Sequence, residues 1–124
     1  TIRRVAPLGA RMPLYVGASG KILIAYAPRH VQEYILADPD WPEAIDKEAF
    51  ECQLAEIKRK GYATSIEERE AGAAAISAPI LNRQGECVAA LAVSGPVGRM
   101  TLAKMEQFAP YVKEAAKRMG AMLR

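Results

Sequence analysis

The chain has 124 residues, of which 51% are apolar, and this is enough for one folded domain with its own core. No apolar run approaches the roughly 20 residues of a membrane-spanning helix, and no signal-peptide pattern opens the chain. The net charge is only +3, and the basic opening lacks interleaved aromatic residues and a helix-turn-helix pattern, which argues against direct DNA binding.

Cysteine and histidine are too sparse for a conventional metal site. Cys52 and Cys87 stand in apolar-periodic segments without C-x-x-C spacing, and His30 is the single histidine. We interpret the cysteines as buried free thiols of a cytoplasmic protein, and we expect neither a metal nor a cofactor.

Hydrophobic periodicity and turn residues divide the first half of the chain into short elements. Asp46 is a favourable N-cap, and Gly61 is a favourable helix stop. The predicted elements are a strand over residues 2–6, a helix over 19–26, a helix over 28–36 that begins at Pro28, a Pro-rich loop over 38–42, and a helix over 47–60.

The second half predicts three consecutive strands and a closing helix. The expected strands cover residues 62–66, 73–81 and 86–94, with a hairpin turn over 82–85. The amphipathic helix covers 101–123 and should be kinked or broken at Pro110. Sequential antiparallel strands with helices before and after them predict an α+β fold with the sheet covered on one side.

The segment from Gly17 to Gly20 joins an extended segment to an apolar helix through small residues only. Such a helix start leaves backbone N–H groups approachable at the positive end of the helix dipole, where a carboxylate or a phosphate can bind. Gly20-Lys21 is not a phosphate-binding P-loop, because Tyr15 and Ile22 stand where that motif needs Gly and Ser or Thr. A nucleophilic Ser19 would need His30 nearby, which we do not expect.

Three further features leave alternatives open. Glu67, Glu68 and Glu70 form either a solvated loop or a loop that folds over a pocket. The alanine run over residues 71–75 leaves volume for a ligand or allows close helix packing. Ser77 and Ser94 bond either to nearby backbone or to a ligand.

The succession of these segments resembles the effector-binding domain of the IclR family of bacterial transcriptional regulators. The resemblance spans nearly the whole chain and rests on Pro13-Leu14, Ala18-Ser19-Gly20-Lys21, Leu23-Ile24-Ala25, Leu54, Ile57-Lys58, Gly61-Tyr62-Ala63, Glu67-Glu68, Gly72, Ile76-Ser77-Ala78-Pro79-Ile80, Ala89 to Pro96, and Met119-Gly120.

The resemblance implies a GAF-like α+β domain over residues 1–124, with an antiparallel sheet and helices that enclose a small-molecule pocket. It implies that a winged helix-turn-helix domain and the first strand of the effector domain are missing here. Binding of a small organic acid or aromatic effector would then alter a homodimer or homotetramer, and through it DNA binding by the missing domain. It implies no catalytic residue, cofactor or membrane contact.

Carried over by position, the implied pocket residues are Leu14, Ala18, Ser19, Gly20, Ser65, Ala75, Ala92 and Ser94. Some members of the family have an acid in place of Ser65, a cysteine in place of Ala75 and a serine in place of Ala92. These differences favour an effector larger than a two- or three-carbon keto acid, with its carboxylate at the Gly17–Gly20 segment. The alternatives are a GAF-like binding module attached to another signalling output and a small enzyme.

Overall fold

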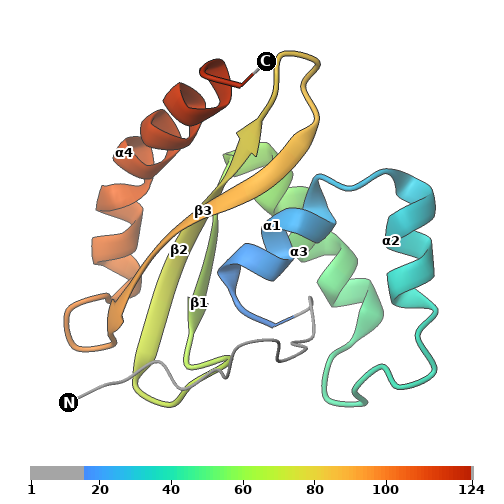
Figure 1. Ribbon diagram of the computed structural model, residues 1–124. Coiled ribbons are helices and arrows are strands. Elements are labelled where there is room, and N and C mark those ends of the chain that lie inside the picture. The colour runs from blue at the N-terminus through green and yellow to red at the C-terminus, as the bar shows by residue number, and fades with distance from the viewer. Residues whose placement is uncertain (1–15, 124) are drawn as a thin grey trace, which may run out of the picture.

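The computed structural model describes residues 16–123 and shows a sheet between two layers of helices (Figure 1). The strand expected over residues 2–6 and Leu14 lie outside the described residues. The elements, in chain order, are α1 (Ala18–Ala25), α2 (Arg29–Leu36), α3 (Lys47–Lys60), β1 (Ala63–Ile66), β2 (Ala73–Leu81), β3 (Cys87–Pro96) and α4 (Leu102–Ala121).

The helix boundaries follow local capping. Asp46 accepts a hydrogen bond from the Ala49 N–H at the start of α3, and Gly61 ends that helix with φ 84°. Thr101 caps α4 in the same way, through the Lys104 N–H. Helix α4 continues through Pro110 as one element, so the expected alternative of a break there is wrong.

The three strands form one antiparallel sheet in the order β1-β2-β3. The register places Ser65, Ala75 and Ser94 in one row across the sheet, and Ser77 lies opposite Ala92 in the next row on the same face. Strand β3 extends to Pro96, two residues further than expected. Because side chains alternate along a strand, the odd-numbered residues of β2 share one face, and the even-numbered residues share the other.

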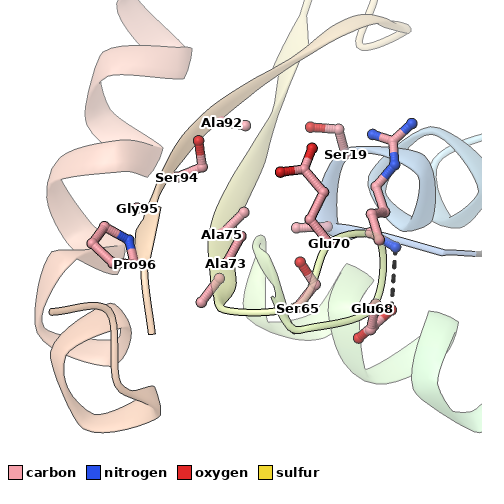
Figure 2. Close-up of a pocket in the computed structure, with 14 residues that line it drawn as sticks. Ser19, Ser65, Glu68, Glu70, Ala73, Ala75, Ala92, Ser94, Gly95 and Pro96 are labelled. Atoms are coloured by element: carbon pink, nitrogen blue, oxygen red, sulfur yellow. Dashed lines mark hydrogen bonds between the residues drawn. The ribbon is translucent and has the colours of Figure 1, made fainter. Parts of the chain in front are cut away.

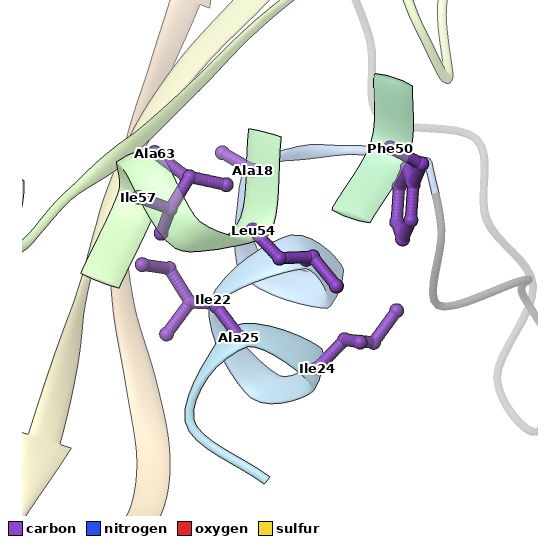
Figure 3. Close-up of a cluster of buried hydrophobic side chains, with 8 residues drawn as sticks. All are labelled: Ala18, Ile22, Ile24, Ala25, Phe50, Leu54, Ile57 and Ala63. Carbon is purple, nitrogen blue, oxygen red and sulfur yellow. The ribbon is translucent and has the colours of Figure 1, made fainter. Parts of the chain in front are cut away.

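Helices cover both faces of the sheet, and the expectation of cover on one side is wrong. One core lies between α1, α3 and the odd-numbered face, and it contains Ile22, Ile24 and Leu54 (Figure 3). The other core lies between α4 and the even-numbered face, where Ile76 contacts the cluster around Met105. Strand β2 has apolar residues at odd and even positions alike, as expected of a strand that is buried on both faces.

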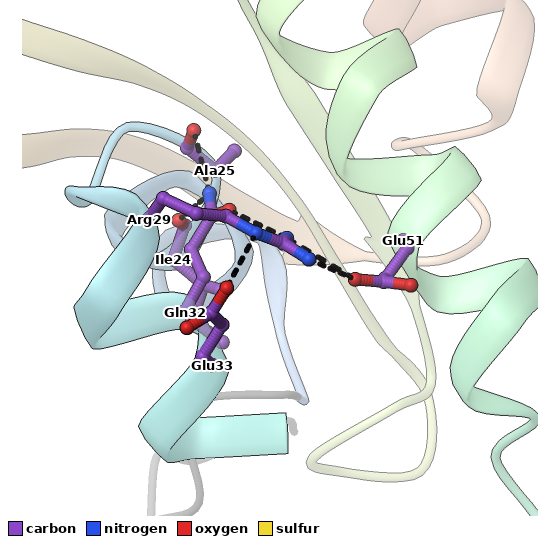
Figure 4. A network of polar contacts seen from close by, with 6 residues as sticks. All are labelled: Ile24, Ala25, Arg29, Gln32, Glu33 and Glu51. Atoms are coloured by element: carbon purple, nitrogen blue, oxygen red, sulfur yellow. Dashed lines mark hydrogen bonds and ion pairs between the residues drawn. The ribbon is translucent and has the colours of Figure 1, made fainter. Parts of the chain in front are cut away.

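Helix α2 has no buried residue, although Ile35 and Leu36 pack partly buried against the core of α1 and α3. Polar contacts also join it to these helices (Figure 4). The Gln32 side chain donates to the carbonyl oxygens of Ile24 at 2.8 Å and Ala25 at 3.3 Å, near the end of α1. Arg29 forms an ion pair at 3.1 Å with Glu51 of α3. These contacts join α2 to α1 and α3 and give the carbonyl groups near the end of α1 a side-chain donor.

Within the part of the chain that the structure describes, no helix combines the length and apolarity needed to cross a membrane.

Candidate ligand-binding site

A cavity of about 320 Å³ lies on the odd-numbered face of the sheet (Figure 2). It is bounded by the start of α1, the β1–β2 loop, and one end of strands β2 and β3. Its lining consists of Gly17, Ala18, Ser19, Ser65, Glu68, Arg69, Glu70, Ala73, Ala74, Ala75, Ala92, Ser94, Gly95 and Pro96. This volume is at the lower end of the range of small-molecule sites, about 300–1,000 Å³.

Short side chains on the sheet create this volume. Ala75 stands between Ser65 and Ser94 in the central row, and Ala92 lies in the next row. Ala74 points to the other face, where it is buried in the α4 core. The alanine run therefore serves both of the roles left open by the sequence, with cavity-facing and helix-packing residues in alternation.

The carboxylate of Glu68 connects the β1–β2 loop to the start of α1. One oxygen accepts a hydrogen bond from the Gly17 N–H at 3.2 Å, and the other lies 2.6 Å from Lys21 Nζ. Lys21 is only 3% exposed, so its charge needs this partner. The loop that carries Glu68 thus folds over a pocket. Its carboxylate already binds one backbone N–H group at the positive N-terminal end of α1.

Gly17 is required where α1 meets this loop. Its φ of 84° lies in the left-handed region that favours glycine. A Cβ added there would come within 2.6 Å of Arg69 Cδ, so the aliphatic part of Arg69 lies directly over the backbone at Gly17. The close approach holds Arg69 against the start of α1.

Two serine hydroxyls connect α1 to the sheet. Ser77, which is completely buried, donates to the Leu91 carbonyl at 3.0 Å and lies 3.3 Å from the Ser19 hydroxyl. Because Ser77 has one hydroxyl proton, and Leu91 receives it, Ser19 is the donor in the contact between the two serines. Of the two interpretations of Ser77, bonding to backbone is therefore confirmed.

Ser65 and Ser94 present hydroxyl groups to the cavity from the two outer strands. Ser65 is 8% exposed, and its hydroxyl has no hydrogen-bond partner among the described residues. The hydroxyl oxygen is nevertheless not fully enclosed, and Ser65 lines the cavity. Ser94 is exposed.

The structure brings together six of the eight implied pocket residues: Ala18, Ser19, Ser65, Ala75, Ala92 and Ser94. Gly20 is buried within α1 and is not part of the lining. Arg69 was missed by sequence analysis, which considered only the acids of its loop. No sequence signal distinguished it, because its position depends on the turn that follows β1.

The Ser19–His30 pair that a nucleophilic Ser19 would need is not formed. His30 is exposed on α2 and does not line the cavity, and Ser19 bonds to Ser77 instead. Within residues 16–123, no group of three or more His, Cys, Asp or Glu side chains could hold a metal ion.

Comparison with known proteins points to one family of regulators. Residues 1–121 match the family described as bacterial transcriptional regulator IclR C-terminal. The chain is 36% identical to the HTH-type transcriptional regulator BhcR of Paracoccus denitrificans, covering 97% of this chain and 45% of that protein. It is 34% identical to the Pca operon regulatory protein of Acinetobacter baylyi, covering 94% of this chain and 44% of that protein. The chain thus spans about half the length of the curated relatives it matches.

Solved structures of C-terminal domains agree with this fold. A double mutant of the inducer-binding domain of the transcription factor PobR from Acinetobacter, in complex with 3-hydroxybenzoic acid, has a TM-score of 0.81 and 29% identity, covering 98% of this chain and 75% of that chain. The C-terminal domain of the Escherichia coli transcriptional regulator KdgR has a TM-score of 0.77 and 28% identity, covering 90% and 71%. The chain belongs to the IclR family of bacterial transcriptional regulators and corresponds to its C-terminal, effector-binding domain.

Proposed function

We propose that this domain binds a small organic acid, of about the size of a hydroxybenzoate, in the cavity between α1 and the sheet. The observation that carries this proposal is a cavity of about 320 Å³ with apolar alanine walls and hydroxyl groups from α1, β1 and β3. The apolar walls suit an aromatic ring, whereas the few polar groups suit the substituents that orient it. The PobR domain that the fold matches was crystallised with 3-hydroxybenzoic acid.

Arg69 is the group proposed to receive the carboxylate of the effector. It lines the cavity beside the start of α1, and no residue within 16–123 forms an ion pair or a hydrogen bond with its guanidinium group. Lys21, by comparison, is already paired with Glu68. A guanidinium group can bind a carboxylate through two parallel hydrogen bonds, which also fixes its orientation.

Effector binding would act on transcription through a change in the population of two states of a larger protein in the cytoplasm. An effector that binds one arrangement of the domain or of its homodimer or homotetramer more tightly shifts the equilibrium toward it. The DNA-binding domain would lie in the part of the relatives that this chain does not span. In this proposal the domain performs no catalysis, in keeping with relatives that are regulators.

The test is the melting temperature of the chain in the presence of keto acids, dicarboxylates and hydroxybenzoates. A ligand of the folded state should raise the melting temperature in proportion to the logarithm of its concentration, once it is in excess. In Ala75→Leu, which fills the cavity from its central row, this rise should disappear. Ala103→Leu places the same side chain at an exposed position of α4 and should retain it.

An equal rise in the wild type and in Ala75→Leu would contradict binding in this cavity. A keto acid of two or three carbons that binds in the low-micromolar range, together with no binding of hydroxybenzoates, would contradict the proposed class of effector.

A further inference from the structure

Some hydrogen-bond acceptors that line the cavity receive a donor from the protein, and others do not. Glu68 and Glu70 both line the cavity from the β1–β2 loop. Both oxygens of Glu68 have partners, namely the Gly17 N–H and Lys21. No residue in the described part of the chain donates to the Glu70 carboxylate. In Figure 2 this carboxylate points toward the end of α1 that carries Ser19.

The Ser19 hydroxyl is also a hydrogen-bond acceptor toward the cavity. Its proton is directed to Ser77, because the Ser77 proton is used at the Leu91 carbonyl. What Ser19 offers to the cavity is therefore an oxygen lone pair. Glu70 and Ser19 are two acceptors from different elements at the same side of one cavity.

Ser65 is a second and independent sign that a ligand supplies hydrogen bonds here. The residue is only 8% exposed, its hydroxyl has no partner within residues 16–123, and it lines the cavity. Because its oxygen is not fully enclosed, a ligand or a water molecule in the cavity can bond to it.

An acid without any donor group is a poor match for this lining. It would bring a negative charge beside the Glu70 carboxylate and would remove water from the acceptors of Glu70 and Ser19 without replacing its hydrogen bonds. Sites that are built to bond a hydroxyl or amino group discriminate strongly against analogues that lack it, because the buried polar groups are then left unpaired.

Resting on the function proposed above, we infer that the effector carries a hydroxyl or amino group in addition to its carboxylate, and that Glu70 and Ser19 accept hydrogen bonds from this group. The carboxylate is then directed to Arg69. This arrangement makes Glu70 a specificity-determining residue for the effector, and it assigns the ligand to the class of hydroxy or amino acids with an apolar body.

The experiment compares two probes of nearly equal shape, 3-hydroxybenzoate and 3-methylbenzoate, by titration calorimetry on the 124-residue chain. The methyl group fills the place of the hydroxyl group but cannot donate. The alanine walls alone would favour the methyl compound, whereas the inferred bonds favour the hydroxyl compound. We expect the wild type to bind 3-hydroxybenzoate about tenfold more tightly or better, which is the usual scale of a hydrogen bond to a charged group.

Glu70→Ala should abolish this preference, and Ser19→Ala should reduce it. Glu67→Ala is the matched control: it removes the same charge from the same loop, at an exposed residue that does not line the cavity, and should leave the preference unchanged. Circular dichroism shows whether each variant is folded.

The outcomes separate the inference from the function on which it rests. Equal binding of both probes by the wild type, a preference retained in Glu70→Ala, or an equal loss in Glu67→Ala would overturn the inference, while the proposed site would stand. If neither the two probes nor any other acid of the panel bound to the folded chain, the proposed function would be overturned, and the inference with it.

Discussion

The two faces of strand β2 have opposite properties within one nine-residue segment. The even-numbered face meets α4 and is closed by Ile76 and Met105, both with no exposed surface. Part of the odd-numbered face meets the start of α1 and is left open by Ala73 and Ala75. The same strand thus supplies stability on one side and a cavity on the other, and substitutions at neighbouring residues should affect different properties.

The largest effect on stability is expected from Ile76→Ala. The substitution removes a completely buried side chain from the α4 face and should lower the free energy of unfolding by about 2–5 kcal/mol, because a cavity remains among its neighbours. Chemical denaturation measures this change. Val93→Ala, at the paired position of β3 with 43% exposure, should cost clearly less. Equal losses would show that Ile76 is not packed more tightly than Val93, its cross-strand neighbour on the same face.

The alanines at 74 and 75 provide the most direct comparison of the two faces. Ala74→Leu should destabilise the fold by about 1–3 kcal/mol, because it forces atoms into the packed core under α4. Ala75→Leu should change stability by about 0.5 kcal/mol or less, since its side chain enters the cavity, and should abolish effector binding. The two variants are compared by denaturation and by titration with effector. A reversed order would contradict the assignment of the faces.

Much of this contrast could be predicted from the sequence. The strand boundaries followed from turn residues, and the helix over residues 47–60 followed from Asp46 and Gly61. Six of the implied site residues line the cavity because they lie on regular elements, where position along the chain determines the face. The two roles of the alanine run stayed open, because a segment of four alanines and one glycine carries no hydrophobic period that would assign its residues to one face of the strand or the other.

The polar part of the site was harder to predict, because it depends on tertiary contacts. Glu68 is distinguished from Glu67 and Glu70 only by meeting Gly17 and Lys21, which lie about fifty residues earlier in the chain. The direction of the hydrogen bond between Ser19 and Ser77 depends on a third group, the Leu91 carbonyl. The cover of both sheet faces likewise depends on where the chain returns after β3.

Smaller effects are expected from removing the hydroxyl group of Ser77 or of Ser94, both on the odd-numbered face of the sheet. Ser77→Ala should lower the free energy of unfolding by about 1 kcal/mol, because the hydrogen bond from this buried hydroxyl to the Leu91 carbonyl is lost. Ser94→Ala, at an exposed serine that lines the cavity, should leave stability unchanged and weaken effector binding by about 1 kcal/mol. Denaturation and calorimetry on both variants test this separation. A loss of stability in Ser94→Ala would assign Ser94 a structural role instead.

The smallest expected effect is a pH dependence of stability from Cys87, which packs partly buried against the core of α1 and α3. Burial raises the pKa of the Cys87 thiol, so the folded state holds this proton more tightly than the unfolded state. The resulting stability is present at neutral pH and is lost as the pH rises above the usual range of a thiol.

Alkylation with iodoacetamide at pH 8 tests this environment. Cys52 is exposed, so the expectation that it is buried is wrong. Cys87 should react more slowly than Cys52, and the rate of Cys87 should rise in denaturant. Mass spectrometry of the two labelled peptides gives the rates separately. Equal rates in the folded protein would show that Cys87 is as accessible to the reagent as Cys52.

The two contacts of Glu68 have a consequence for how such a domain can diversify in evolution. The Glu68 side chain ties the β1–β2 loop to α1, and its replacement would leave the buried Lys21 without this partner. Its neighbours Arg69 and Glu70 have no ion-pair partner in the described part of the chain. Selection can therefore exchange these two residues without disturbing the fold, and new effector preferences can arise by single substitutions in a loop whose position is already secured.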